Sequence, residues 1–307
     1  MSLYAELRPR AFAIAYRMLG SVSEAEDVVQ EALLRLHQSL VRGEEIGSAP
    51  AYVGTIVTRL AIDQLRSARA RRERYVGDWL PEPLLTDPTP AEQAETADSL
   101  SLAFLVLLET LTPHQRAAFL LREVFDYPYA DVAEIVGTDV DTARHLVARA
   151  RRHVSERRPR YYATRRQRDE LAARFFAAAE RGDLRALESL LAHDVVLHGD
   201  GGGNSPAPAR PINGRRRVAR HMATGLRLVA EHGGIRLRPA EVNGRPGALA
   251  FDARDRLFAV LHLEIGDAGI QTISSVVNPD KLRHLAATSD LGALIKRYNT
   301  RSLRVES

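Results

Sequence analysis

Apolar side chains recur at three- and four-residue spacing through the first 75 residues, and this period predicts helices. The first apolar stripe covers residues 3–18. The second stripe, over residues 25–36, follows Ser23-Glu24-Ala25-Glu26, which is a capping-box pattern. The third stripe, over residues 53–65, follows Pro50, a residue that is favoured at the first position of a helix. The chain therefore begins as a bundle of helices.

A second helical stretch is predicted over residues 99–155. Thr112-Pro113 marks the start of one helix, and a short apolar helix over 129–136 ends at Gly137. The turn at residues 138–141 leads into a helix whose exposed positions are mostly basic. A short helix, a glycine turn and a basic second helix form a helix-turn-helix pattern, and such a helix fits the major groove of DNA. A helical bundle with a basic rim is the alternative interpretation.

Between these two helical stretches the composition changes. Residues 81–98 contain four Pro and five acidic residues and no basic one, so we interpret residues 77–98 as a linker. The linker contains the chain's only Trp, Trp79, followed by Leu80. An apolar pair of this kind predicts that the linker packs against a folded surface.

After Arg168 the pattern becomes mixed. Helices are expected at about 167–181, 184–191 and 214–230, with a last helix around 289–300. Between them lie apolar or alternating segments typical of strands, at residues 195–197, 235–237, 248–251, 257–265 and 270–277. Helices followed by four or five antiparallel strands indicate an α+β domain.

Composition excludes several classes of protein. The chain has 307 residues, of which 45% are hydrophobic and 27% charged, which indicates two or three globular domains. It contains no Cys, so a disulfide framework, a Cys-based zinc site and thiol redox chemistry are excluded. No apolar run reaches the ~18–20 residues of a membrane span, and no signal peptide is recognised. We expect a cytoplasmic protein with no membrane contact, no metal and no cofactor.

Charge is unevenly distributed along the chain. The 43 Lys and Arg residues exceed the 39 Asp and Glu residues by only four, but two segments are strongly basic. Residues 66–74 contain five Arg, and residues 144–168 contain ten Arg and one acidic residue. Two separate basic segments favour two contacts with a polyanion, and solvated helix faces are the equally weighted alternative.

The second predicted helix has the opposite character. Glu24, Glu26, Asp27 and Glu31 have no basic residue among them, so they would repel DNA and suit a basic protein surface. The helix dipole also explains acidic residues in a first turn, but it does not explain Glu31.

The residues also carry a family resemblance. Residues 15–21 (AYRMLGS) and 25–31 (AEDVVQE) resemble region 2 of bacterial extracytoplasmic-function sigma factors. Residues 58–67 (TRLAIDQLRS) resemble the helix that melts and reads the promoter −10 element in that family. Residues 112–153 resemble region 4, which binds the −35 element.

Three further motifs resemble one subgroup of that family, the sigma factors with a fused SnoaL-like domain. Residues 79–83 (WLPEP) match its linker motif, and residues 278–282 (NPDKL) match a motif of its extension. Residues 200–204 (DGGGN) match its DGGGK motif, except that Asn204 replaces the Lys and removes its charge. The matches occur in the same order as in the family and span nearly the whole chain.

The resemblance implies a multidomain fold: two all-α sigma domains, a region 2 helical bundle and a region 4 helix-turn-helix, followed by an α+β SnoaL-like cone domain. The expected boundaries are 1–76 for region 2, 77–98 for the linker, 99–161 for region 4, 167–285 for the SnoaL-like domain and 286–307 for a helical tail. The implied function is to bind core RNA polymerase and direct promoter-specific transcription initiation, without catalysis by the chain itself.

The resemblance also assigns residues to partners. Region 2 would bind the β′ clamp helices of core RNA polymerase, and region 4 its β flap. The expected polymerase-binding residues are Glu24, Glu26, Asp27, Gln30 and Glu31. The expected −10 DNA-binding residues are Arg59, Asp63, Arg66, Arg69, Arg71 and Arg72. The expected −35 DNA-binding residues are Arg144, His145, Arg149 and Arg152.

The extension is expected to regulate the sigma domains in cis by contacting their linker. The residues implied in this contact are Trp79, Leu80, Pro81, Asp200, Gly201, Gly202, Gly203, Asn278, Pro279, Asp280 and Lys281. The contact would hold the two DNA-binding modules in a compact arrangement. Opening would need a signal, either a small ligand in the cone or contact with core polymerase.

Two other functions are compatible with the residues. A SnoaL-like enzyme fused to a DNA-binding head would use a carboxylate or His inside the cone as general acid or base. Its candidates are His193, Asp194, His198, Asp200, His221 and His262, which show no catalytic spacing. A repressor that binds duplex DNA without polymerase would not need the acidic helix.

Overall fold

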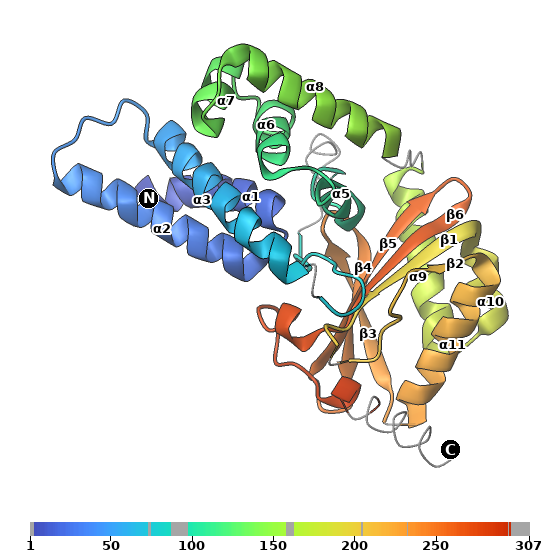
Figure 1. Cartoon of the computed structure of the whole chain (residues 1–307). Coiled ribbons are helices and arrows are strands. Elements are labelled where there is room, and N and C mark those ends of the chain that lie inside the picture. The colour runs from blue at the N-terminus through green and yellow to red at the C-terminus, as the bar shows by residue number, and fades with distance from the viewer. Residues whose placement is uncertain are drawn as a thin grey trace. The chain divides into compact units, whose positions relative to one another are not determined.

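The computed structural model describes residues 3–72, 75–86, 98–157, 163–203, 205–231, 233–293 and 295, with the helical backbone alone at 68–72 and 157. The chain forms two compact units (Figure 1). One consists of residues 1–74 with 104–158, and the other of residues 75–103 with 159–307. The linker is thus grouped with the C-terminal part of the chain, and the chain passes between the units three times.

The first half of the first unit is a three-helix bundle. It consists of α1 (Leu3–Leu19), α2 (Val22–Val41) and α3 (Ala49–Arg72). The predicted apolar stripes form its core. The predicted capping box at Ser23 is wrong. The N-cap is Ser21, whose hydroxyl accepts a hydrogen bond from the Glu24 amide at 3.2 Å, because α2 begins two residues earlier.

The second half of this unit contains the predicted helix-turn-helix. The helices of this half are α5 (Leu102–Leu108), α6 (Pro113–Glu123), α7 (Tyr129–Val136) and α8 (Val140–Arg157). The helix-turn-helix consists of α7 and α8. Thr112 and Gln115 form a complete capping box at the start of α6. Gly137 ends α7 with a left-handed φ of 76°, a conformation that glycine adopts without steric cost.

The C-terminal unit is a six-stranded sheet with helices on one face. The helices are α9 (Arg165–Glu180), α10 (Leu184–Leu190) and α11 (Arg215–Glu231). The strands, in chain order, are β1 (Leu191–Asp200), β2 (Ile212–Asn213), β3 (Ile235–Val242), β4 (Arg245–Asp252), β5 (Leu257–Gly266) and β6 (Gly269–Val276). A 3₁₀ turn, Pro279–Lys281, follows β6.

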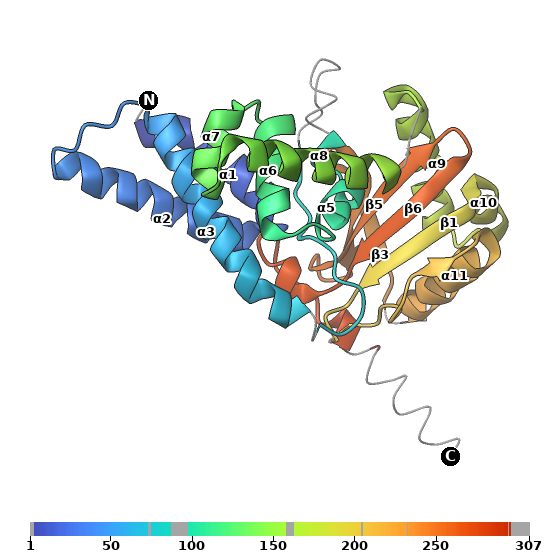
Figure 2. The ribbon, with the colours of Figure 1, turned by 45° about the horizontal axis from the view of Figure 1, so that its top comes forward.

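The strand order in the sheet is β2-β1-β6-β5-β4-β3. The expectation of a purely antiparallel sheet is wrong, because β1 and β6 pair in parallel. The chain passes through α11 and four strands between them, so no tight hairpin forces these neighbours to be antiparallel. Figure 2 shows α9, α10 and α11 beside the same face of the sheet.

The core of this unit lies between α9, α10, α11 and that face of the sheet. Phe175 and Phe176 from α9 pack there against alternate apolar residues of the strands. The opposite face carries the side chains of Arg245, His262 and Glu264, which are also buried. Of the predicted last helix, residues 291–293 and 295 are helical, and residues 296–300 lie outside the described part.

Across the described residues, no helix is both long and apolar enough to cross a membrane.

Candidate functional site

The acidic residues of α2 lie on the side of the helix that faces away from its apolar stripe. Asp27 and Gln30 are exposed, and Glu24, Glu26 and Glu31 are partly exposed. Glu26 pairs with Arg8 of α1 at 2.5 Å, and Glu31 pairs with Arg35 at 2.7 Å. These are weak surface ion pairs, so the acidic face is available to a basic partner.

The predicted −10 residues lie on α3, and two of them contact the helices of region 4. The Arg59 guanidinium donates to the carbonyl oxygens of Glu134 at 2.9 Å and Ile135 at 3.2 Å. These carbonyls belong to the last turn of α7, where no intrahelical donor reaches them. Arg59 therefore caps α7 in this arrangement of the chain.

Arg66 lies two turns further along α3. It pairs with Asp63 at 3.4 Å and lies 3.1 Å from the His114 ring of α6. Arg69, Arg71 and Arg72 belong to the same helix, but their side chains lie outside the described part. In this arrangement Arg59 and Arg66, on the helix predicted to bind the −10 element, both contact protein groups and remain exposed.

The predicted −35 residues all lie exposed on α8, the second helix of the helix-turn-helix. Arg144 pairs with Asp141 at 2.9 Å, and its guanidinium lies 5.7 Å from the Tyr129 ring. His145, Arg149 and Arg152 are exposed. Arg151, on the same helix, instead forms a two-contact ion pair with Glu123 of α6, at 2.6 and 3.0 Å.

A buried arginine that the sequence analysis did not identify connects the two halves of this unit. The side chain of Arg116 in α6 donates to the carbonyl oxygen of Met18 at 2.5 Å and to that of Leu108 at 3.0 Å. It also pairs with Glu109 at 2.5 Å. Burial lowers the pKa of Arg116 to about 9. The sequence signal was an Arg four residues before Leu120, on the apolar face of its helix.

Most of the residues expected to hold the linker meet at one place in the C-terminal unit. Asp200 is fully buried at the end of β1, and its carboxylate accepts hydrogen bonds from Lys281 Nζ at 2.7 Å and the Leu80 amide at 2.9 Å. It also accepts from the Tyr75 hydroxyl at 2.5 Å. Burial raises the pKa of Tyr75, and the hydrogen bond to Asp200 raises it further. We name this cluster of Asp200, Lys281, Tyr75 and Leu80 the linker anchor.

Lys281 holds the linker by more than its charge. Its ammonium donates to the Leu80 carbonyl and lies 4.3 Å from the centroid of the Trp79 ring. A cation over an indole face is attracted by the ring's electrons, and the attraction is stronger in a buried place. This contact gives the chain's single Trp the packing partner that the sequence predicted.

The glycines after Asp200 allow this approach. Gly202 has a φ of 57°, and a Cβ atom there would lie 2.3 Å from the side-chain nitrogen of Asn278. Asn278 in turn donates to the Tyr75 hydroxyl at 2.8 Å. Gly203 has a φ of 73°, and its added Cβ would meet the Val76 side chain at 3.3 Å. Asn204 lies outside the described residues.

A second contact of the linker was not predicted. Asn243, fully buried in the turn between β3 and β4, accepts a hydrogen bond from the Leu84 amide and donates to the Leu100 carbonyl, both at 2.9 Å. One side chain thus holds residues on both sides of segment 87–97. The signal for it was Asn-Gly at residues 243–244, a typical hairpin turn.

Buried charges next to this contact also involve the end of the linker. Arg245 pairs with Asp98 and lies 3.3 Å from Glu264. Burial raises the pKa of Glu264 to about 7, although Arg245 opposes the shift. Burial and Arg245 lower the pKa of His262 to about 3.

The candidate acid and base residues do not converge on one site. His193 and Asp194 are exposed on β1. His198 contacts Asp78 at 3.0 Å, Asp200 belongs to the linker anchor, and His262 is buried on the opposite face of the sheet from α11. His221 is the member of this set that lines the large cavity of the unit. Within the described ranges, no cluster of three or more His, Asp or Glu residues is arranged to hold a metal ion.

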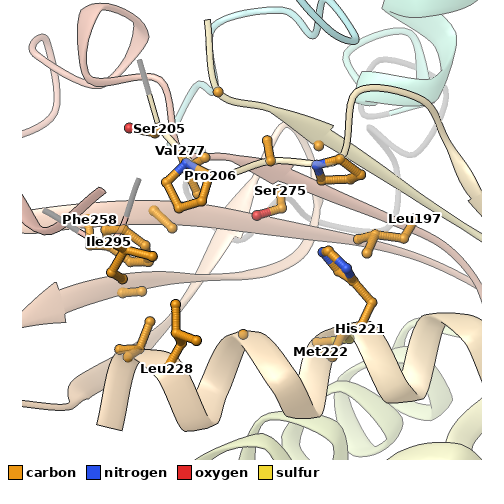
Figure 3. A pocket seen from close by; sticks show the side chains of 18 of the residues that line it. Leu197, Ser205, Pro206, His221, Met222, Leu228, Phe258, Ser275, Val277 and Ile295 are labelled. Carbon is orange, nitrogen blue, oxygen red and sulfur yellow. The ribbon is translucent and has the colours of Figure 1, made fainter. Parts of the chain in front are cut away.

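That cavity lies between α11 and the strands β1, β5 and β6, and has a volume of about 610 Å³. Figure 3 shows the His221 ring pointing from α11 into it, toward the strand that carries Ser275. Apolar side chains such as Met222, Leu228 and Phe258 form much of its wall. Gly77, the first residue of the linker, and Val76 directly before it also line the cavity.

Comparison with known proteins agrees with this geometry. The family models Sigma-70 region 2 and Sigma-70, region 4 match residues 3–71 and 101–154. The chain is also 36% identical over 295 residues to a curated extracytoplasmic-function (ECF) sigma factor, with 92% of each chain covered. The chain belongs to the family of ECF RNA polymerase sigma factors. It is a non-catalytic factor that binds RNA polymerase and promoter DNA and directs transcription initiation.

That relative is the ECF RNA polymerase sigma factor SigJ of Mycobacterium tuberculosis. The probable ECF RNA polymerase sigma factor SigI of the same species is 31% identical over 281 residues, covering 89% of this chain and 91% of its own. The crystal structure of Mycobacterium tuberculosis SigJ matches with a TM-score of 0.71 at 32% identity, covering 91% of this chain and 96% of that one. The similarity therefore extends through the C-terminal unit.

Proposed function

We propose that the C-terminal unit of this sigma factor regulates transcription by holding the linker between the two DNA-binding regions. In this proposal the domain boundaries are 1–76, 77–98, 99–161, 167–285 and 286–307, as the sequence predicts. The observation that carries it is the linker anchor, where the buried carboxylate of Asp200 binds Lys281 and the linker together. A linker held in this way limits how far regions 2 and 4 can separate.

The sigma regions divide the binding tasks between them. The acidic face of α2 docks on the β′ clamp helices of core polymerase, and region 4 docks on the β flap. The α3 residues Arg59, Asp63 and Arg66, with Arg69, Arg71 and Arg72, bind the −10 element as single-stranded DNA. The α8 residues Arg144, His145, Arg149 and Arg152 bind the −35 duplex.

In the first unit the helices of region 2 contact those of region 4, which we call its closed arrangement. This arrangement supports regulation by release of the linker. Arg59 contacts α7 and Arg66 contacts α6. Two side chains that bind −10 DNA in this proposal therefore also hold α3 against the helices of region 4. Promoter binding at two separate elements requires these contacts to break. Release of the linker makes that separation easier, so release raises transcription.

The test is run-off transcription with bacterial core RNA polymerase on a promoter from the region upstream of the protein's own gene. The variants are Lys281→Met and Asp200→Asn in the full chain, with Arg283→Met as the matched control. Arg283 is two residues from Lys281, but it is exposed and pairs only with Asp280 among the described residues. Binding to core polymerase is measured in parallel for every form.

We expect both anchor variants to raise the transcript yield by about fivefold or more, which is a typical size for coupling between two sites. The control variant should match the unmodified chain. Equal yields from all four forms with equal core affinity would show that the anchor does not regulate. No promoter-specific transcript and no core binding from any form would contradict the sigma function itself.

A further inference from the structure

The cavity of the C-terminal unit has the size and chemistry of a small-molecule site. Its volume of about 610 Å³ falls within the range of pockets that bury small ligands. Among the described residues that line it, no side chain is that of Asp, Glu, Lys or Arg. An ionised ligand placed there would lose its hydration without gaining an opposite charge.

A few polar groups interrupt the apolar wall. His221 from α11 and Ser275 from β6 both line the cavity, and Figure 3 places the imidazole ring on the side of the cavity opposite the Ser275 hydroxyl. Neither side chain makes a hydrogen bond within the described part of the chain. Partial burial lowers the pKa of His221, which favours the neutral ring, and a neutral imidazole has one nitrogen that donates and one that accepts.

We propose that this cavity binds an uncharged, largely hydrocarbon small molecule with one hydroxyl or carbonyl group, and that binding stabilises the docked linker. The polar group of the ligand hydrogen-bonds with His221 or Ser275, and the hydrocarbon part packs on the apolar wall. This inference rests on the proposed function for its effect on transcription, but not for the binding itself.

The start of the linker forms one edge of the cavity, and this position determines whether a bound ligand favours the docked or the released linker. Val76 lines the cavity and packs next to Gly203, yet the residue remains 65% exposed. A ligand in the cavity covers this exposed valine only while the linker is docked. A ligand shifts an equilibrium toward the state in which it has more contacts, so it favours the docked linker. In the proposed function it therefore lowers transcription, which is opposite to the expectation that a ligand in the cone opens the chain.

The chain's own C-terminal residues are the other candidate occupant, because Ile295 lines the cavity and residues 296–307 follow it. Their composition argues against them. Lys296, Arg297, Arg301 and Arg304 give this segment four positive charges, and the described lining offers no carboxylate to pair with them. A neutral ligand matches the wall better than a cationic peptide does.

The binding experiment uses the full chain and two matched pairs of probes. 1-Decanol is compared with decanoate, and 9-anthracenemethanol with 9-anthracenecarboxylate, so that each pair differs in charge at nearly constant size. Affinity is measured by titration calorimetry at neutral pH. Hydrogen exchange of the Leu80 amide, which donates to Asp200, reports on linker docking in the same samples.

Two variants of α11 distinguish the cavity from other surfaces. Gly225 lines the cavity, and a Cβ atom there would meet nothing within 4 Å, so Gly225→Leu fills space without a clash. Leu is also a better helix former than Gly, so this variant should fold. Arg227→Leu places the same side chain two residues away, at an exposed position outside the lining, and is the control.

We expect at least one neutral probe to bind, with an affinity about tenfold or more above that of its carboxylate partner. Gly225→Leu should abolish the binding and Arg227→Leu should retain it, and the bound probe should slow exchange of the Leu80 amide. Binding of neither neutral probe, equal or tighter binding of the carboxylates, or faster exchange at Leu80 would overturn the inference. Binding that appears only after residues 296–307 are removed would show that this segment is the occupant.

Run-off transcription then separates the inference from the proposed function. A probe that binds and slows exchange at Leu80 but leaves transcript yield unchanged would contradict the regulatory function and leave the ligand site intact. A response of transcription to Lys281→Met without binding of any probe would contradict the ligand site and leave the regulatory function intact.

Discussion

The guanidinium of Arg116 donates a hydrogen bond of 2.5 Å to the carbonyl oxygen of Met18, at the end of α1. This contact joins α6 of region 4 to the three-helix bundle of region 2 through a side chain that is almost fully buried. Buried carbonyl groups that lose a donor are costly, because water cannot replace it. The closed arrangement of the first unit therefore depends strongly on one residue.

Replacing Arg116 with Lys tests this dependence. A single ammonium cannot reach the carbonyls of Met18, Leu108 and Leu105 and the Glu109 carboxylate together. We expect Arg116→Lys to lower the free energy of unfolding by about 2–4 kcal/mol. The measurement is urea unfolding of the full chain followed by circular dichroism.

Arg35→Lys is the control, because Arg35 forms an exposed pair with Glu31 on one helix. It should change the stability by less than about 0.5 kcal/mol. A loss at Arg116 no larger than this would mean that α6 and α1 do not rely on the buried guanidinium.

Asn243 offers a prediction about the linker. It combines a positive φ of 51° with two side-chain hydrogen bonds, one to Leu84 in the linker and one to Leu100 just after it, and two substitutions separate these features. Asn243→Gly keeps the backbone conformation and loses the amide, so we expect a loss of about 2–3 kcal/mol. Asn243→Ala should lose about 1 kcal/mol more, because its Cβ atom disfavours the left-handed conformation that Gly adopts freely.

Hydrogen exchange of the Leu84 amide gives the local readout, since this amide donates to Asn243. Both variants should accelerate its exchange. Asp255→Gly, at an exposed turn with a φ of 59°, should leave it unchanged. Slow exchange at Leu84 in Asn243→Gly would show that the linker is held without the amide.

The sequence identified the features of this fold that depend on neighbouring residues. Helix positions, the Thr112 cap and the Gly137 stop follow from local spacing and from turn chemistry. The motif at residues 200–203 was found because its residues are adjacent, although its contact with Tyr75 spans 125 residues. The misplaced cap at Ser23 shows the limit, because Ser21 and Ser23 are both plausible from sequence.

Features that depend on distant residues were missed for a common reason. Arg116 and Met18 are 98 residues apart, and Asn243 and Leu84 are 159 residues apart, so no local pattern pairs them. The parallel pairing of β1 with β6 likewise depends on how α11 and the four strands between them in the sequence pack. A charged residue on an apolar helix face and an Asn-Gly turn were the visible signals, but neither specifies a partner.

Gly202 tests the close packing around the linker anchor. Its φ of 57° and the short approach of Asn278 both exclude a side chain, whereas Gly214 has a φ of 91° with nothing within 4 Å. Gly214→Ala therefore measures the backbone cost alone, about 1–2 kcal/mol. We expect Gly202→Ala to cost about 1–3 kcal/mol more, because Asn278 must move away from Tyr75.

Trp79 fluorescence gives the matching local signal, because Lys281 lies over its ring. Gly202→Ala should shift the emission maximum of the folded protein, and Gly214→Ala should not. The same shift in both variants would assign the change to general loosening of the unit and not to the anchor.

The raised pKa of Glu264 makes the stability of the fold depend on pH. Its folded-state pKa of about 7 lies above its ordinary value of 4.5, so the native state holds a proton that the unfolded state has released. This group therefore stabilises the fold at low pH, and its contribution is lost as pH rises from about 4.5 through 7. His262 acts in the opposite sense, because its lowered pKa weakens the fold as pH falls from about 6.5 toward 3.

Glu264→Gln isolates the first of these effects. Gln resembles the protonated carboxyl, so the variant and the unmodified chain should have similar stability at pH 5. At pH 8 the variant should be more stable by about 2–3 kcal/mol, because it carries no charge to bury. Urea unfolding at several pH values between these limits gives the comparison. The charged groups around Glu264 are Arg245, Asp98 and Arg168, and the nearby His262 is neutral over this range because its pKa is lowered to about 3. A constant difference across the range would contradict the raised pKa.

Two arginines of α8 test the assignment of the −35 surface. Arg149 is exposed, whereas Arg151 is held by two contacts with Glu123. Affinity falls as the salt concentration rises, and each phosphate contact makes the slope of log affinity against log salt concentration steeper by close to one unit. We expect Arg149→Met to make this slope less steep by about one unit, and Arg151→Met to leave it unchanged.

The measurement is binding of the polymerase holoenzyme to a labelled duplex with the −35 element, between about 50 and 200 mM salt. Arg151→Met serves as the control for loss of a positive charge on the same helix, since its charge is already paired. Equal reductions in both variants would mean that Arg151 leaves Glu123 when DNA binds. An unchanged slope for Arg149 would mean that a different face of α8 meets the phosphates.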